Sequence, residues 1–396
     1  MQLSQRVAHC SLSPMRKFHP YAVAAAARGT KIYHLNIGQP DIETPAAFFD
    51  ALRDFDAKVL EYAASPGQPQ LIDAIVRYYQ RLGTDYTADD ILITTGGSEA
   101  LMIVMMCLLD PGSEILIPEP FYPNYATFIT AAGGHIVPIP TSVDEGYRYA
   151  DRQRIESRIT PNTRAILMTN PGNPTGTVLT REEMRLIADI AKEHGLYIIS
   201  DEVYREFCYL GSGLTESMSQ FRDIEENLIL IDSVSKRFSA CGARVGCLVS
   251  KNRDFIAQAL KFCQARLSVA TLDQVGAAAL YSVDAAYFAA SREEYRARRD
   301  TVLRCLRQIP GVQMAQPDGA FYLMAALPVD DADAFQTWLL TDFQDRDETV
   351  MFAPGEPFYA TPGLGKNEIR IAYVLKQERL ERAIELLGLG LAAYNR

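Results

Sequence analysis

One lysine of this chain has the neighbours that an amine needs to form an imine beside a bound phosphate. Lys236 lies in residues 233–244, which read SVSKRFSACGAR. Most lysines are solvated surface charges, so the lysine alone predicts little. The spacing carries the prediction, because Ser233 and Ser235 place hydroxyls before the lysine and Arg244 adds a permanent cation eight residues after it.

Pyridoxal phosphate is a cofactor that such a lysine can hold. It needs an amine, a cradle for its phosphate, a carboxylate for its ring nitrogen and a flat face against its ring. For the cradle the sequence offers Gly97, Ser98 and Glu99 at the start of a predicted helix, together with Arg244 and the two serines of the lysine run. N–H groups at a helix N-terminus favour anions. A glycine turn by itself more often marks a plain helix start, so this prediction depends on the lysine run.

A carboxylate for the ring nitrogen follows an apolar strand. Asp201 ends the run of residues 197–201, YIISD, and could pair with a pyridine nitrogen and keep it protonated. Tyr204 lies three residues later and is placed to hydrogen-bond the ring's phenolic oxygen. Without the lysine run, Asp201 would be read as a helix N-cap and Tyr204 as a packed aromatic residue.

A rigid turn follows another apolar strand. Residues 170–176, NPGNPTG, contain two prolines and two glycines, which fix an extended turn. The amide of Asn173 is held in this turn, where it could donate to the same phenolic oxygen. A plain surface turn is the alternative interpretation of this segment.

The elements that must position these groups alternate short apolar runs with helical patterns, which predicts an α/β fold. Near-continuous apolar runs are typical of strands that are buried on both faces, so we expect a mostly parallel sheet. In such sheets ligands bind at the C-terminal ends of the strands, where the candidate groups lie. The predicted strands are 91–94, 114–118, 136–139, 165–169, 196–200, 228–232 and 245–249. A helix is predicted over 180–194, with Thr180 and Glu183 as a capping box.

The chain length favours two domains. With 396 residues and 48% hydrophobic content, the chain can bury large cores. The pattern changes after residue 282, where charge-rich helical stretches flank short apolar segments. We therefore expect a large cofactor-binding domain over 48–282, a smaller C-terminal domain over 283–396, and an N-terminal segment, 1–47, that packs on the smaller domain.

The composition argues against several classes of protein. A net charge of −10 opposes general affinity for nucleic acid or an anionic membrane. Seven cysteines without a CxxC pattern are typical of reduced thiols, and no signal-peptide pattern opens the chain, so we expect a cytoplasmic protein. The five histidines show no paired spacing, so no metal site is predicted.

Together these segments resemble the class I and II aminotransferases. The lysine run resembles the pyridoxal-phosphate signature of that family, and residues 170–176 resemble one of its loops. Residues 352–355 (FAPG) and 367–372 (NEIRIA) resemble the family's loop and strand around a substrate-binding arginine, and residues 36–41 (NIGQPD) also match. The resemblance therefore covers essentially the whole chain, with motif order and spacing preserved.

The resemblance implies the aspartate-aminotransferase fold, which has a large domain with a mostly parallel seven-stranded sheet and a smaller α/β domain. It also implies a homodimer whose active sites use both subunits. The implied reaction is a ping-pong transfer of an amino group from an L-amino acid to a 2-oxo acid. Lys236 would release the cofactor to the substrate amine and then move the α-proton.

The resemblance also assigns roles to five other residues. It implies that Asn173 contacts the cofactor and substrate, and that Tyr122 stacks on the pyridine ring. Tyr62 matches the tyrosine that reaches the phosphate of the neighbouring subunit. Arg370 would grip the substrate α-carboxylate as a bidentate pair, and Gly38 would lend its backbone N–H to the same group.

One departure from the family leaves the substrate side chain open. Some aspartate aminotransferases of this subgroup carry a lysine in the glycine turn for the distal carboxylate, whereas this chain has Ser98. Arg28, Arg237 or Arg266 could supply a substitute charge. Dicarboxylic, alanine-like, aromatic and broad specificities are all compatible with the sequence.

Two other functions share most of these residues. A lyase on the same scaffold, such as a carbon–sulfur lyase or an enzyme like aminocyclopropane-carboxylate synthase, would use the same cofactor contacts. A regulatory cofactor-binding domain would need a fused DNA-binding domain. Only about 35 residues precede the first motif, fewer than such a domain needs.

Overall fold

A seven-stranded sheet forms the centre of the computed structural model, which describes residues 1–211 and 213–396. Its strand order is β2-β8-β7-β6-β5-β3-β4. β8 runs antiparallel to β2 and β7, and the other neighbours are parallel. The strands are β2 (Ile91–Thr94), β3 (Glu114–Pro118), β4 (His135–Ile139), β5 (Thr163–Thr169), β6 (Tyr197–Asp201), β7 (Leu228–Ser233) and β8 (Gly246–Val249). The prediction of a mostly parallel seven-stranded sheet is confirmed.

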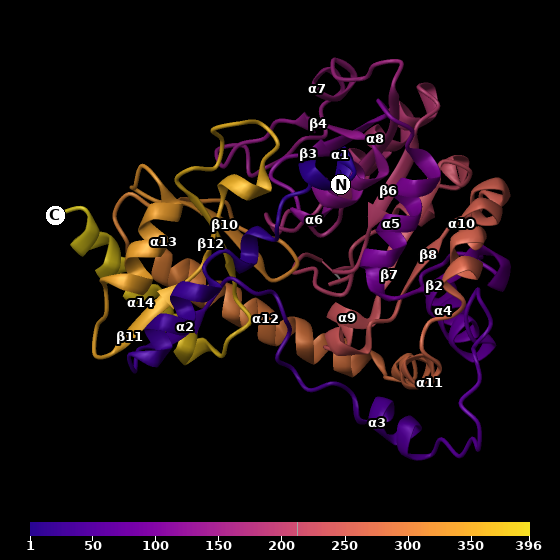
Figure 1. Cartoon of the computed structure of the whole chain (residues 1–396), viewed down its shortest axis with the longest axis horizontal. Coiled ribbons are helices and arrows are strands. Elements are labelled where there is room, and N and C mark those ends of the chain that lie inside the picture. Colours follow the sequence, from indigo (N-terminus) through magenta and orange to yellow (C-terminus); the bar gives the residue numbers. More distant parts are fainter. Residues whose placement is uncertain (212) are drawn as a thin grey trace.

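Helices cover both faces of this sheet, which explains why its strands are almost wholly apolar (Figure 1). On one face lie α4 (Pro69–Arg81), α8 (Arg181–Glu193) and α11 (Thr271–Leu280). On the other face lie α5 (Gly96–Leu108), α6 (Asn124–Ala132) and α10 (Arg253–Arg266). The remaining helices before residue 283 are α1 (Gln5–His9), α2 (His19–Ala27), α3 (Ala46–Arg53), α7 (Arg152–Glu156) and α9 (Val234–Arg237).

The predicted capping box fixes the start of α8. The Thr180 side chain accepts a hydrogen bond from the Glu183 backbone N–H, and the Glu183 carboxylate accepts one from the Thr180 N–H. Gly195, with a φ of +64°, follows the end of the helix. Because two N–H groups at the helix start are satisfied by side chains, the sequence alone determines this boundary.

A second, four-stranded sheet has the order β12-β13-β10-β9, and β1 pairs with β11 in a parallel two-stranded sheet beside it. The N-terminal segment therefore lies against the C-terminal third of the chain, and Figure 1 shows α2 close to β11 and α14. The strands are β1 (Lys31–His34), β9 (Gln313–Met314), β10 (Tyr322–Ala326), β11 (Glu348–Met351), β12 (Ala353–Pro354) and β13 (Glu368–Ala372). The helices are α12 (Ala285–Leu306), α13 (Ala332–Thr341) and α14 (Gln377–Tyr394).

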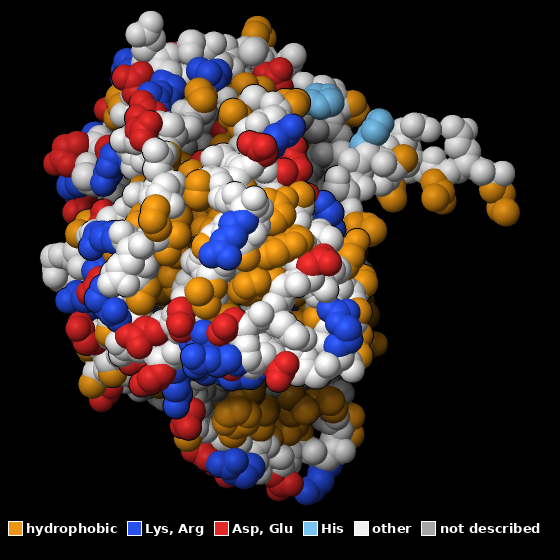
Figure 2. Space-filling model, turned by 90° about the vertical axis from the view of Figure 1, so that its left-hand side faces the viewer, with side chains coloured by type: hydrophobic (Ala, Val, Ile, Leu, Met, Phe, Trp, Pro, Cys, Tyr) orange, Lys and Arg blue, Asp and Glu red, His pale blue; other side chains and the backbone are white. Residues whose placement is uncertain are grey.

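The division into domains at residues 47 and 282 stays a prediction, and the arrangement of the cores supports it. One hydrophobic cluster joins the second sheet with α12, α13 and α14, while two other clusters lie on the two faces of the seven-stranded sheet. Figure 2 views the molecule from the side of α13 and α14, where hydrophobic side chains gather among mixed acidic and basic ones.

In the described part of the chain, no helix has the length and apolar character to cross a membrane.

Two glycines allow the start of α5 to approach the sheet closely. A Cβ on Gly246 would lie 2.6 Å from the carbonyl carbon of Gly96 and 2.8 Å from the Asp232 carbonyl oxygen. Gly96 has a φ of +71°, and a Cβ there would lie 2.7 Å from a guanidinium nitrogen of Arg244. The N-terminus of α5 can therefore lie against β7 and β8 only because both positions lack a side chain.

We expect Gly246→Ala to lower the free energy of unfolding by about 2–3 kcal/mol, because the atoms in its way are backbone and cannot rotate aside. Gly242→Ala is the matched control. A Cβ at Gly242 meets nothing within 4 Å, so this change should stay within about 0.5 kcal/mol of the unmutated protein. Urea denaturation of both variants measures the difference, and equal stabilities would contradict the close-approach argument.

Candidate functional site

A cavity of about 420 Å³ lies where β6 and β7 end, beside the first turn of α5 and the four-stranded sheet. The ends of β6 and β7, the turns after β3 and β5, the N-terminal segment and β13 contribute the groups that the sequence predicted. All but two of the predicted site residues line this cavity: Gly38, Gly97, Ser98, Tyr122, Asn173, Asp201, Tyr204, Ser233, Ser235, Lys236, Arg244 and Arg370. Groups from seven separate parts of the sequence are thereby brought together.

The two exceptions are Tyr62 and Glu99. The Tyr62 residue is 80% exposed and lies outside the cavity. The Glu99 carboxylate turns back to accept a hydrogen bond from the Thr95 N–H at 2.6 Å and lies 3.3 Å from the guanidinium of Arg266. The side chain of Glu99 is therefore engaged with its own helix and α10, and a cofactor contact through its backbone stays a prediction.

Lys236 extends from the short helix α9 into the cavity. Its Nζ atom donates a hydrogen bond to the Gly38 carbonyl at 3.0 Å and lies 3.9 Å from the Cys241 thiol. Ser233 begins α9 as its N-cap, and the Ser233 hydroxyl accepts from the Ser235 N–H at 3.0 Å. The amine is thus held at the junction between the N-terminal segment and the seven-stranded sheet.

An anion-binding corner lies beside this lysine. The first turn of α5 leaves N–H groups without partners inside the helix, and Gly97 and Ser98 bring this turn to the cavity. Arg244 has a left-handed backbone, with a φ of +52°, and its guanidinium donates to the carbonyls of Cys241 and Thr95 at 3.3 and 3.5 Å. These donors and the hydroxyls of the α9 turn can surround a phosphate.

Asp201 is buried at the end of β6. Burial raises the pKa of its carboxyl from 3.8 to about 6, while hydrogen bonds to the charged form oppose this shift. The Tyr125 hydroxyl donates to Oδ2 of Asp201 at 2.6 Å, and the Val203 N–H donates to Oδ1 at 3.3 Å. Because the Tyr125 proton is given to Asp201, Thr169 is the donor in the 2.7 Å bond between the Tyr125 and Thr169 hydroxyls.

Two tyrosines join the two sheets across the cavity. The hydroxyls of Tyr204 and Tyr322 lie 2.9 Å apart, and the Tyr322 hydroxyl donates to the Gly38 carbonyl at 3.5 Å. A Cβ on Gly38 would lie 1.9 Å from the Tyr322 hydroxyl, so only glycine fits at this position. Desolvation raises the pKa of Tyr204 well above 10, which keeps its hydroxyl protonated as a hydrogen-bond donor.

Arg370 lies on β13 and reaches the cavity from the four-stranded sheet. Its guanidinium donates to Oδ1 of Asn173 at 3.1 Å and to the Asn36 carbonyl at 2.7 Å, and it lies over the Tyr322 ring at 4.6 Å. Burial lowers its pKa from the ordinary value. These two oxygen acceptors orient the guanidinium fork, and Arg370 lines the cavity.

Comparisons with known proteins find relatives over nearly the whole chain. Residues 30–387 match the family model described as aminotransferase class I and II. The aspartate/prephenate aminotransferase of Thermus thermophilus is 30% identical over 391 residues, which cover 97% of each chain. The arginine–pyruvate transaminase of Pseudomonas aeruginosa is 32% identical over 94% of this chain and 93% of that protein.

The chain belongs to the class I and II aminotransferase family. Solved structures of aminotransferases have the same fold as this chain. The alanine aminotransferase of Pyrococcus furiosus superposes with a TM-score of 0.90 at 29% identity, over 99% of this chain and 100% of that one. The Thermus thermophilus aspartate aminotransferase with maleate superposes with a TM-score of 0.89 at 28% identity, over 98% of this chain and 100% of that one. This aminotransferase therefore has the fold that the sequence predicted.

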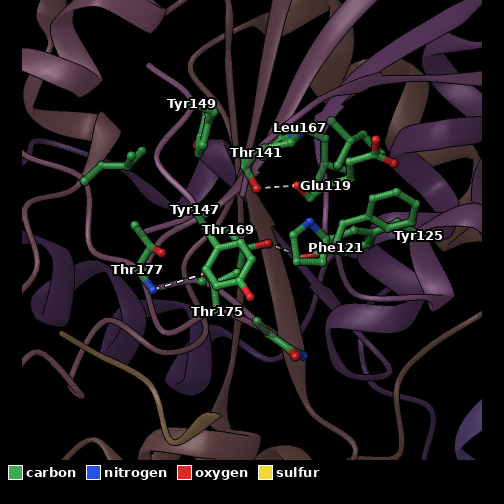
Figure 3. Close-up of a pocket in the computed structure, with 16 residues that line it drawn as sticks. Glu119, Phe121, Tyr125, Thr141, Tyr147, Tyr149, Leu167, Thr169, Thr175 and Thr177 are labelled. Carbon is green, nitrogen blue, oxygen red and sulfur yellow. Dashed lines mark hydrogen bonds between the residues drawn. The ribbon is translucent and has the colours of Figure 1, made fainter. Parts of the chain in front are cut away.

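A second, smaller cavity of about 30 Å³ lies behind the site of this aminotransferase, and Tyr125 and Asn173 line both cavities. Figure 3 shows the Tyr125 hydroxyl near Thr169, with Tyr147 and Tyr149 across the cavity. In the described part of the chain, the buried Tyr149 hydroxyl has no hydrogen-bond partner. A polar space of this size suits one ordered water, which would satisfy such a hydroxyl.

Sequence reasoning missed several residues of the site. Tyr125 lies three residues after Tyr122 in the same segment, and its role as a donor depends on β6 lying next to β5. Tyr322 lies in one of the short apolar segments after residue 282, and its place in the site depends on β10 pairing with β13. Arg16 and Cys241 also line the cavity, and the spacing of neither had suggested this. The one signal in the sequence that could have found such a residue is an aromatic side chain close to a recognised motif, as Tyr125 is to Tyr122.

We expect Tyr125→Phe to raise the pKa of Asp201 further, by about one unit, because one hydrogen bond to a charged group is worth about 1.5 kcal/mol. The mutation removes a donor that favours the ionised carboxyl, so the pH at which Asp201 ionises moves up from about 6. Carbon-13 NMR of labelled aspartate in the cofactor-free protein measures the midpoint.

Tyr122→Phe is the control for this experiment. The Tyr122 hydroxyl accepts from the Asn124 amide at 2.7 Å and makes no hydrogen bond to Asp201. Removal of the Tyr122 hydroxyl should leave the pH midpoint of the Asp201 titration nearly unchanged. A midpoint that does not move in Tyr125→Phe, or that moves equally in both variants, would show that the Tyr125 hydrogen bond does not hold Asp201 ionised.

Proposed function

We propose that this aminotransferase binds pyridoxal phosphate in the larger cavity and uses it for ping-pong transfer between an L-amino acid and a 2-oxo acid. One observation carries the proposal. Lys236, Asp201, Arg244 and Arg370 are far apart in the sequence, yet they line one cavity with an amine, a carboxylate and two guanidinium groups. These are the groups that the cofactor and an amino-acid carboxylate require.

The phosphate would lie in the corner formed by the first turn of α5 and by Arg244. Gly97 and Ser98 supply backbone N–H groups, and Ser233 and Ser235 supply hydroxyls beside them. The absence of a side chain at Gly96 and Gly246 supports this assignment, because it lets the helix N-terminus reach the same corner as Arg244.

The ring would lie between Tyr122 and the end of β6. Ionised Asp201 would pair with the protonated ring nitrogen, and the Tyr125 hydrogen bond favours that ionised form. The Tyr204 hydroxyl and the Asn173 amide would donate to the phenolic oxygen. Both groups line the cavity beside Arg370, and the Tyr204 hydroxyl keeps its proton at neutral pH.

The substrate carboxylate would bind Arg370 and the backbone N–H of Gly38. Bidentate pairing with a buried guanidinium would orient the substrate Cα–H bond. The bound cofactor supplies an electron sink that lets this bond break. The Lys236 amine, which lies 3.0 Å from the Gly38 carbonyl, would then accept the proton from Cα and deliver it to the imine carbon.

The lyase alternative would use the same cofactor contacts, but the similar proteins do not favour it. The relatives and solved structures reported above are named as aminotransferases or as a transaminase. Incubation with an amino acid alone separates the two reactions. Sustained release of ammonia and a 2-oxo acid without any acceptor would identify a lyase.

We propose further that the aminotransferase is a homodimer in which Tyr62 reaches the phosphate of the other subunit. Large apolar side chains are exposed near Tyr62: Val59 and Leu60 precede it in the chain and are 69% and 61% exposed. The Thr271 hydroxyl bonds to the Glu61 carbonyl, which places this segment beside α11. Such exposed apolar residues favour a protein interface.

A cytoplasmic location of the aminotransferase is consistent with its seven free cysteines.

Lys236→Ala should abolish the visible absorbance of lysine-bound cofactor and reduce transamination by several orders of magnitude, because the amine holds the cofactor and moves the proton. Absorbance spectroscopy and a single-turnover assay measure the two effects. Lys192→Ala, which removes an exposed amine that pairs with Asp223, is the control and should retain both. A visible lysine-bound cofactor in Lys236→Ala would refute the assignment.

Arg370→Ala should weaken amino-acid and oxo-acid binding by on the order of 100-fold or more while cofactor loading persists, because the mutation removes a charged bidentate pair. The half-reaction at varied substrate concentration measures binding, and the visible absorbance measures loading. An unchanged half-reaction would remove the proposed role of Arg370, whereas a loss of both would indicate a structural role instead.

A further inference from the structure

The larger cavity contains one cation that the proposed function does not use. Lys236, Arg244 and Arg370 are assigned to the cofactor and the α-carboxylate. Arg16, the last residue of a short helical turn at residues 14–16, also lines this cavity. Within residues 1–211 and 213–396, the guanidinium of Arg16 forms no ion pair with a carboxylate.

The three arginines that the sequence suggested as substitutes for the missing lysine are engaged elsewhere. Arg28 donates to the Leu340 carbonyl at 2.8 Å, Arg237 is buried against Asp232, and Arg266 binds Glu99 and the Ile93 carbonyl. None of them lines the cavity. Arg16 is thus the cation that remains for a second acidic group of the substrate.

The position of Arg16 is fixed by its neighbours in the chain. Its N–H donates to the Ser13 carbonyl at 3.1 Å. Lys17 pairs with Asp333 at the start of α13, and Phe18 is 2% exposed in a small apolar cluster with Leu340. These two anchors attach the segment to the part of the molecule that also carries Arg370.

The chemistry of the wall around Arg16 suits an anion. The polar side chains of Ser13, Gln39, Ser98 and Asn124 line the same cavity. Asp201 is the one carboxylate among the described residues that line it, and it is assigned to the cofactor ring. A guanidinium without a carboxylate partner beside neutral polar groups can bind a carboxylate in a bidentate pair.

We propose that Arg16 binds a second carboxylate of the substrate, so that the aminotransferase acts on amino dicarboxylic acids and the corresponding oxo acids. The inference rests on the proposed function, because Lys236 and Arg370 determine where the substrate lies relative to Arg16. It takes the place of Arg28, Arg237 and Arg266, which the sequence left open as candidates and which do not line the cavity. Arg16 is a residue that determines specificity, and it has no part in proton transfer.

The test compares the cofactor-loaded protein with its Arg16→Gln variant in single-turnover half-reactions with L-aspartate, L-glutamate and L-alanine. The measured quantity is a ratio of second-order rate constants at low substrate concentration: the value for the better of aspartate and glutamate divided by the value for alanine. This ratio should fall on the order of 10- to 100-fold in the variant. Arg304→Gln removes an exposed charge that pairs with Glu381 and does not line the cavity, and it should leave this ratio unchanged.

A binding measurement accompanies the half-reactions. The dissociation constant of maleate, a dicarboxylate, should rise about 10-fold or more in Arg16→Gln, whereas that of propionate should change by less than about threefold. The visible absorbance of the bound cofactor reports both. Arg16→Lys should recover part of the maleate affinity, because it keeps the charge but loses the fork.

The outcomes separate this inference from the proposed function. Equal loss for aspartate, glutamate and alanine, an unchanged ratio, or a preference of the unmutated protein for alanine would overturn the role of Arg16 while the half-reaction still occurs. A protein that shows no lysine-bound cofactor absorbance and no half-reaction with any amino acid would overturn the proposed function itself, and this inference with it.

Discussion

The buried carboxylate of Asp232 is the interaction on which the geometry of the site depends. It accepts hydrogen bonds from the Arg237 guanidinium and from the Ser233 N–H, so it closes the turn that presents Lys236. Arg205 lies on its other side and also pairs with Glu202, just after β6. Losing one partner of such a buried pair costs about 3–5 kcal/mol, so the turn has little freedom to move.

The same turn joins the two halves of the site. From the fixed end of β7, Lys236 reaches the Gly38 carbonyl, which belongs to the N-terminal segment and also accepts from Tyr322 on the second sheet. Arg370 reaches back to Asn173 in the turn after β5. The cavity therefore lies where the two sheets meet, and hydrogen bonds from Lys236 and Arg370 to oxygen atoms of the other parts connect them.

Several elements could be predicted because their causes are local. The capping box of Thr180 and Glu183 and the apolar runs of the buried strands gave boundaries within about two residues of those observed. The antiparallel direction of β8 could not be predicted, because an apolar run is the same in either direction and its pairing depends on distant strands. The engagement of Glu99 with Arg266 depends likewise on α10 packing beside α5.

The amino-acid sequence by itself determined the family, because the spacing within the lysine run and the order of the motifs along the chain can be recognised without knowing how distant segments pack. It also determined the α/β alternation. Only the tertiary structure decided which arginines line the cavity, since the position of a side chain depends on how distant elements pack. Arg237 and Arg266 pair with carboxylates outside the cavity, whereas Arg16 and Arg370 line it.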